Sequence, residues 1–74
     1  MQDEYYKNEY KKLAEKLKTL RIRNGQRQGW VAARIRKSQS YVSKVEAGKL
    51  DVGAIEIAEF AKVYKKPLDF FLSV

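Results

Sequence analysis

The chain has 74 residues and a net charge of +7, and it contains neither cysteine nor histidine. This length predicts one domain spanning residues 1–74. The composition excludes disulfides and cysteine-based zinc sites, and it removes the commonest general base and metal ligand, so we expect no enzyme, metal or cofactor. No apolar run approaches the ~20 residues of a membrane helix. Because the N-terminus is not a signal peptide either, we expect a soluble cytoplasmic protein without a membrane partner.

The positive charge is concentrated in the middle third of the sequence. Residues 21–50 hold eight Lys or Arg and one acid, Glu46. The preceding residues have five Lys against four acids, and the following residues have three Lys against four acids. Clustering of this kind favours an anionic partner, with nucleic acid as the first candidate.

In chain order, the first predicted element is a long helix that begins near Asp3 and ends before Gly25. One apolar stripe recurs along it at spacings of three or four residues and consists of Tyr6, Tyr10, Leu13, Leu17 and Leu20. The Asn24-Gly25 pair predicts its end, because Gly tolerates the left-handed conformation that follows a helix.

Two short helices are predicted next. The first spans about residues 27–36, with Val31, Ala32 and Ile35 as candidates for burial. The second spans about residues 39–47, with Ser38 as its N-cap and Gly48 as its stop.

The second of these short helices has two unlike faces. Helical spacing places Val42 and Val45 on an inner face, where they anchor the helix to the core. The outer face then carries four hydrogen-bonding side chains, Gln39, Ser40, Ser43 and Lys44.

A fourth helix is expected to follow Asp51 as its N-cap. Its inner stripe consists of Ala54, Ile57, Ala58, Ala61 and Tyr64, with Phe60 beside it. Pro67 is suited to the first position of a short fifth helix. That segment holds more apolar residues than so small a domain has room to bury, and exposed apolar patches mark interfaces. We therefore predict a homodimer whose interface contains Tyr64, Phe70, Phe71, Leu72 and Val74, with the N-terminal helix as a further candidate.

The two short helices, joined by a tight connection within the basic block, form a helix-turn-helix pattern at about residues 28–47. In motifs of this kind the second helix enters the DNA major groove. Over about residues 13–72 the chain resembles the Cro/repressor-type helix-turn-helix transcriptional regulators, most specifically in the segment SQSYVSKVEAGK. The resemblance implies an all-α, five-helix, lambda-repressor-like DNA-binding domain, here with a long N-terminal helix.

The resemblance also implies roles for individual residues. It assigns base reading to the outer face of the third helix, where Gln suits adenine and Lys suits guanine. It places Gln28 against the DNA backbone and beside Gln39, and it pairs Arg21 with Glu46 as a structural ion pair. We expect further contacts to the DNA backbone from six other residues: Arg27, Arg36, Lys37, Ser38, Tyr41 and Lys49.

Two positions leave alternatives open. Arg36 stands where the family usually has Gly, so either Arg36 has a positive φ, at a cost of roughly 1 kcal/mol, or the turn has a different geometry. Trp30 either folds back under a stacked Arg34, or it lies in a protein interface or against the DNA sugar-phosphate.

We predict a sequence-specific regulator that binds double-stranded DNA, most simply a bacterial or phage-encoded repressor acting as a homodimer on a palindromic operator. The alternative hypothesis is an antitoxin or anti-repressor-type protein. Such a protein mainly binds another protein and regulates its own synthesis through DNA.

Overall fold

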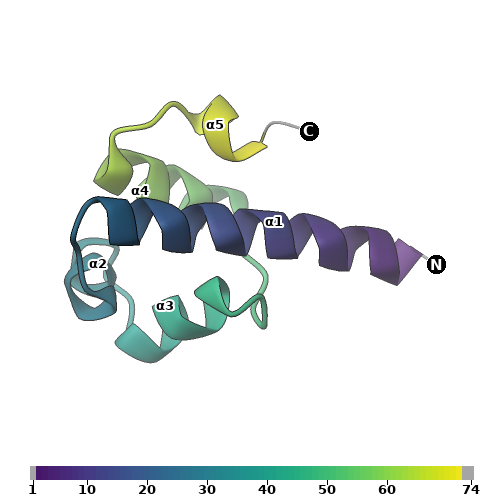
Figure 1. Ribbon diagram of the computed structural model, residues 1–74, viewed down its shortest axis with the longest axis horizontal. Helices are drawn as coiled ribbons and strands as arrows, with labels where there is room; N and C mark the ends of the chain where they lie inside the picture. Colours follow the sequence, from purple (N-terminus) through teal and green to yellow (C-terminus); the bar gives the residue numbers. More distant parts are fainter. Residues whose placement is uncertain (1, 73–74) are drawn as a thin grey trace.

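The computed structural model describes residues 2–72 of the chain, with side chains described from Tyr10 to Leu72. This part contains five helices and no strand: α1 (Gln2–Arg23), α2 (Gln28–Arg34), α3 (Gln39–Glu46), α4 (Ala54–Tyr64) and α5 (Leu68–Leu72). In Figure 1, α1 crosses the molecule, with α2 and α3 on one side of it and α4 and α5 on the other. The predicted all-α fold is confirmed.

The core lies where α1, α2, α3 and α4 converge. Leu17, Val31, Val42, Val45 and Phe60 are its largest fully buried side chains. Val42 and Val45 are therefore the inner face of α3, as predicted. Among the predicted stripe residues, Tyr10 and Ala54 are exposed, while Tyr6 lies outside the residues whose side chains are described.

Four helices end in the same way, with two hydrogen bonds that close the last turn. After α1, the Gln26 amide donates to the Arg21 carbonyl and the Gly25 amide donates to the Ile22 carbonyl. This is the Schellman arrangement, which needs a residue in the left-handed conformation. Gly25 (φ +68°) and Gly48 (φ +72°) fill that place after α1 and α3, as predicted.

Basic residues fill the same place after α2 and α4. Arg36 has φ +58° and Lys65 has φ +55°, although neither is glycine. Each belongs to the same pair of bonds, with Lys37 donating to the Ala32 carbonyl and Lys66 donating to the Ala61 carbonyl. Of the two alternatives for the turn between α2 and α3, the chain therefore adopts the strained one.

The start of α4 differs from the prediction. Its N-cap is Gly53 rather than Asp51. The Asp51 carboxylate accepts a hydrogen bond of 3.1 Å from the Tyr10 hydroxyl of α1. Glu56 folds back over the cap, so that a Cβ at Gly53 would lie 2.6 Å from its Oε1. A carboxylate in that place is stabilised by the positive, N-terminal end of the helix dipole.

The other boundaries shift by one or two residues. α1 already includes Gln2, α2 is shorter than the predicted range of 27–36, and Pro67 directly precedes α5 instead of being its first residue. Among the helices of the described part, none combines the length and the apolar character needed to cross a membrane.

Candidate nucleic-acid interface

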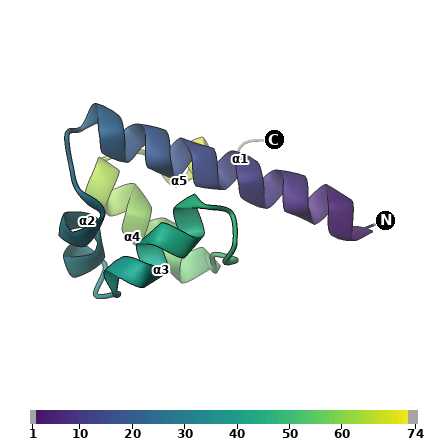
Figure 2. The ribbon, with the colours of Figure 1, turned by 60° about the horizontal axis from the view of Figure 1, so that its bottom comes forward.

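The α3 helix lies on the outside of the molecule, beside α2 (Figure 2). It begins where predicted, because the Ser38 hydroxyl accepts a hydrogen bond of 3.1 Å from the Tyr41 amide. Its inner valines are fully buried, with 0% and 1% of their surface exposed. The opposite face is exposed and carries the four predicted base-reading side chains, Gln39, Ser40, Ser43 and Lys44. The buried valines therefore hold α3 in place, and its outer face presents a row of hydrogen-bond donors and acceptors.

The end of α3 is tied to α1 by an ion pair. The Nε of Arg21 donates to Oε2 of Glu46 over 2.8 Å, and the side chains are only 14% and 3% exposed. Arg21 also donates to the Gln26 carbonyl over 2.9 Å. The hydrogen bond with Glu46 raises the pKa of Arg21 despite the opposing effect of burial, so the guanidinium stays charged. Glu46 is thus a buried carboxylate with a fixed charged partner.

Gln28 completes this arrangement from α2. Its Nε2 donates to Oε1 of Glu46 over 3.2 Å, and its side chain is half-buried. The expected neighbour, Gln39, lines the same surface pocket as Gln28, and its Oε1 lies 3.7 Å from where a Cβ of Gly29 would be. No local sequence pattern predicts this bond, because Gln28 and Glu46 are far apart in sequence and meet only when α2 packs on α3.

Basic and polar side chains surround the start of α3. Five of the predicted backbone contacts are exposed. Arg36, Lys37 and Ser38 directly precede α3, Lys49 is in the turn after it, and Arg27 is the N-cap of α2. Tyr41 is half-buried, and the Lys37 Nζ lies 5.3 Å from its ring centre. Burial raises the pKa of Tyr41, so its hydroxyl remains protonated and able to donate.

Trp30 has the first of its two predicted arrangements. The Arg34 guanidinium carbon lies 3.8 Å from the centre of the indole ring, which is half-buried and packs against the core. Stacking holds both side chains on the surface of α2.

Two predicted dimer residues belong to the core of the domain. Tyr64 is 6% exposed and stacks on Phe60, and Phe71 is 5% exposed. They are therefore not available to a partner in this conformation, because α4 and α5 leave room for both rings between themselves and α1. Phe70 and Leu72 are exposed, at 36% and 53%, while Val74 lies outside the described residues.

The hydroxyl of Tyr64 is buried and has no hydrogen-bond partner among the described residues. Burial raises the pKa of Tyr64 to about 12; the negative charge of Glu46 adds to this and the positive charge of Arg21 opposes it. The hydroxyl is therefore a polar group enclosed in the core. Helical periodicity predicted that the Tyr64 ring is buried, but it gave no sign that the hydroxyl would lack a hydrogen-bond partner.

One family of known proteins matches this chain. A family model described as "Helix-turn-helix domain" matches residues 12–69, which includes α2, α3 and the turn between them. No curated protein and no solved structure matches the chain.

Proposed function

The chain belongs to the helix-turn-helix domain family, and from this premise we propose that it is a sequence-specific, double-stranded DNA-binding repressor that acts as a homodimer. One observation carries the proposal. The exposed side chains of α3 are hydrogen-bonding groups, while its other face is anchored by two buried valines and by Glu46.

These side chains suit the edges of base pairs in the major groove. The amide of Gln39 matches the donor and acceptor pattern of adenine, and the Lys44 ammonium matches the acceptors of guanine. Ser40 and Ser43 can donate or accept a hydrogen bond, so each can contact more than one kind of base. Lys49, directly after the α3 stop, supplies positive charge for a phosphate.

Affinity would come mainly from the surrounding cations. Arg27, Arg36, Lys37 and Lys49 are exposed near α3, and each phosphate they neutralise makes binding weaker as salt rises. Gln28 donates one N–H of its amide to Glu46, which leaves the other N–H for a phosphate.

A dimer suits this mode of binding. One α3 reads only a few base pairs, whereas a two-fold dimer places a second helix ~34 Å along the duplex, on the other half of a palindromic site. Repression then requires only that the dimer occupy an operator that overlaps a promoter.

Selection from random duplex DNA tests the proposal. We expect an enriched palindromic motif at moderate salt, and a chain that enriches no motif would contradict sequence reading. The variant Gln39→Ala should change the preferred bases at one position of each half-site, at a cost of about 1–3 kcal/mol for the original sequence.

Lys49→Ala is the matched control for that variant. It should weaken binding to all duplexes about equally and lower the slope of log affinity against log salt by about one. If Gln39→Ala behaved in the same way, Gln39 would be a phosphate contact and not a base-reading residue.

A further inference from the structure

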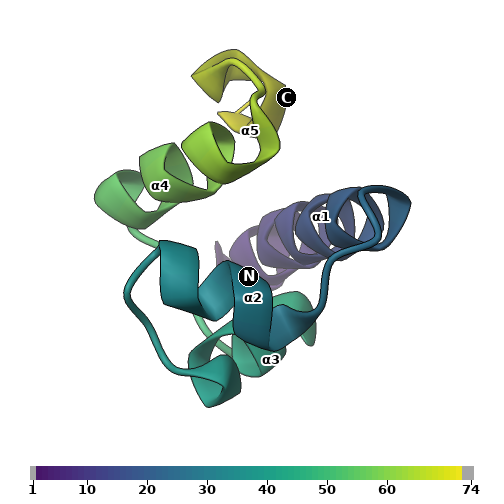
Figure 3. The same cartoon turned by 90° about the vertical axis from the view of Figure 1, so that its left-hand side faces the viewer.

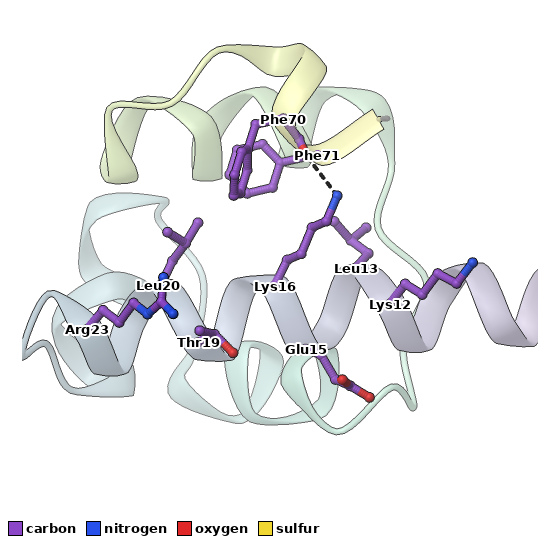
Figure 4. Close-up of a pocket in the computed structure, with 9 residues that line it drawn as sticks. All are labelled: Lys12, Leu13, Glu15, Lys16, Thr19, Leu20, Arg23, Phe70 and Phe71. Atoms are coloured by element: carbon purple, nitrogen blue, oxygen red, sulfur yellow. Dashed lines mark hydrogen bonds between the residues drawn. The ribbon is translucent and has the colours of Figure 1, made fainter. Parts of the chain in front are cut away.

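A groove with a volume of 370 Å³ runs between α1 and α5, on the side of α1 away from α3 (Figures 3 and 4). One face of α1 lines it between Lys12 and Arg23, and Phe70 and Phe71 line it from α5. Sites for small molecules begin at a volume of about 300 Å³, so this groove has room for a compact ligand.

The floor of the groove is apolar. Leu20 and Phe71 are buried at its base, and Leu13 is half-buried beside them. Phe70 is exposed, and its ring meets that of Phe71 edge to face, with 5.2 Å between the ring centres. An apolar group that enters the groove therefore leaves water for a surface of aromatic and aliphatic carbon, which is favourable.

The rim of the groove is positively charged. Three cations of α1 line it, Lys12, Lys16 and Arg23. A carboxylate, Glu15, lines it too, but its side chain points away from α5 in Figure 4. Lys16 reaches across to the opposite wall, where it donates to the Phe70 carbonyl over 2.8 Å. The charge of the rim thus complements that of an anion.

Arg23 is the cation best placed to hold such an anion. It is exposed, and no hydrogen bond, ion pair or ring contact engages it within the part of the chain that the structure describes. In Figure 4 its side chain extends along α1 in the direction of Leu20, which lies one turn earlier on the same face. A guanidinium binds a carboxylate through two parallel hydrogen bonds, so a charged end group and the apolar floor can be contacted together.

We propose that the groove binds a small amphipathic carboxylate, with a flat apolar body and one anionic end. The body lies along Leu20 and the Phe70 ring, and the carboxylate pairs with Arg23. Lys16 begins ~10.5 Å away along the helix and closes the other end of the site through its bond to α5. Binding requires no DNA, because none of these residues is among those proposed to contact it.

Naphthoate is a suitable probe, because it joins one carboxylate to a flat apolar body. Naphthylmethanol with the same ring attachment is its neutral control. For a ligand of this size we expect a Kd on the order of 1 mM, which the amide chemical shifts of the isotope-labelled chain measure directly. At low salt the carboxylate should bind roughly threefold to fivefold more tightly than the alcohol. Equal affinities would overturn the proposed anionic ligand.

The same spectra locate the site. We expect the largest shift changes at the amides of residues 16–23 on α1 and of Phe70 and Phe71 on α5. Larger changes in α2 or α3 would overturn the proposal, because the anion would then occupy the basic surface around the helix-turn-helix. No change at about ten times the expected Kd would overturn it as well.

Arg23→Gln and Lys18→Gln are matched variants, since each removes one positive charge from an exposed position of α1 and only Arg23 lines the groove. Arg23→Gln should weaken carboxylate binding roughly threefold to fivefold and leave binding of the alcohol unchanged. Lys18→Gln should change neither. Unaltered carboxylate binding by Arg23→Gln would overturn the role of Arg23. An equal loss for both ligands would also overturn it, because it would reflect a change in the shape of the groove instead of a lost charge pair.

Discussion

The two sides of α1 hold their neighbouring helices by different physical means. Towards α3, the connection is a buried ion pair between Arg21 and Glu46, joined by the amide of Gln28. Towards α5, it is the buried ring of Phe71 and an exposed hydrogen bond from Lys16 to the Phe70 carbonyl.

This difference matters because hydrogen bonds and ion pairs fix angles as well as distances, whereas apolar burial is non-directional. A helix that reads bases must keep its side chains within a fraction of an ångström of their positions. A helix that only covers a core, such as α5, needs no comparable control. The ion pair therefore serves orientation, and the Phe71 ring serves stability.

Phe71→Ala should have the largest effect on stability. Removing a buried Phe side chain costs about 3 kcal/mol in the free energy of unfolding, measured by urea denaturation. Because α3 is attached elsewhere, the base preference of the DNA that still binds should not change. Leu72→Ala, at a side chain that is 53% exposed, is the control and should cost less than about 0.5 kcal/mol. A changed base preference in Phe71→Ala would show that the two sides are coupled.

Glu46→Gln should have the next largest effect and lower the free energy of unfolding by about 2 kcal/mol. The value is below that for a fully buried pair, because Arg21 remains partly exposed and the new amide can still accept its hydrogen bond. Unlike Phe71→Ala, this variant removes the charge that orients α3, so operator affinity should fall by more than stability alone explains. Glu59→Gln, at an exposed carboxylate of α4, should change neither quantity. Unaltered operator binding by folded Glu46→Gln would refute the orienting role.

Arg36→Gly and Lys65→Gly form a matched pair of variants, and we expect their effects on stability to be smaller still. Each removes a side chain from a left-handed position, and each should raise the free energy of unfolding by about 0.5–1 kcal/mol. Only Arg36→Gly removes a cation beside α3, so only that variant should bind DNA more weakly and with a shallower salt dependence. Equal DNA binding by both would mean that Arg36 contacts no phosphate.

Local patterns predicted the features that depend on a few neighbouring residues. Ser38 caps α3, Gly25 and Gly48 close α1 and α3, and Val42 and Val45 are buried, because capping and periodicity act within one or two turns. The exposed row on α3 follows from the same periodicity.

Features that depend on distant segments were not predictable in this way. Asp51 does not cap α4, and its carboxylate accepts a hydrogen bond from Tyr10, which is far away in sequence. The inward bond of Gln28 arises only when α2 packs on α3. The apolar excess of the C-terminal segment indicated an interface, but the burial of Phe71 depends on the space that α1 and α4 leave between them.

Tyr64→Phe should have the smallest effect on stability. It tests whether Tyr64 of α4 interacts with the ion pair between α1 and α3. The Tyr64 hydroxyl is buried near Glu46 without a hydrogen bond, so removing it should leave the free energy of unfolding unchanged or raise it by up to about 1 kcal/mol at neutral pH. A loss of stability would instead mean that the hydroxyl bonds to the ion pair in solution.

The pH dependence of the same variant gives an independent check. The pKa of Tyr64 rises from 10.0 to about 12 on folding, so between these values the unfolded chain releases a proton that the folded chain keeps. The unfolded state then binds fewer protons, and the stability of the original chain must fall as the pH rises through this window. Tyr64→Phe lacks this contribution, so its stability relative to the original chain should increase from neutral to alkaline pH in urea denaturation. Parallel plots of stability against pH for the two chains would show that the hydroxyl is not enclosed. In that case Tyr64 would have no part in the ionic contact between α1 and α3.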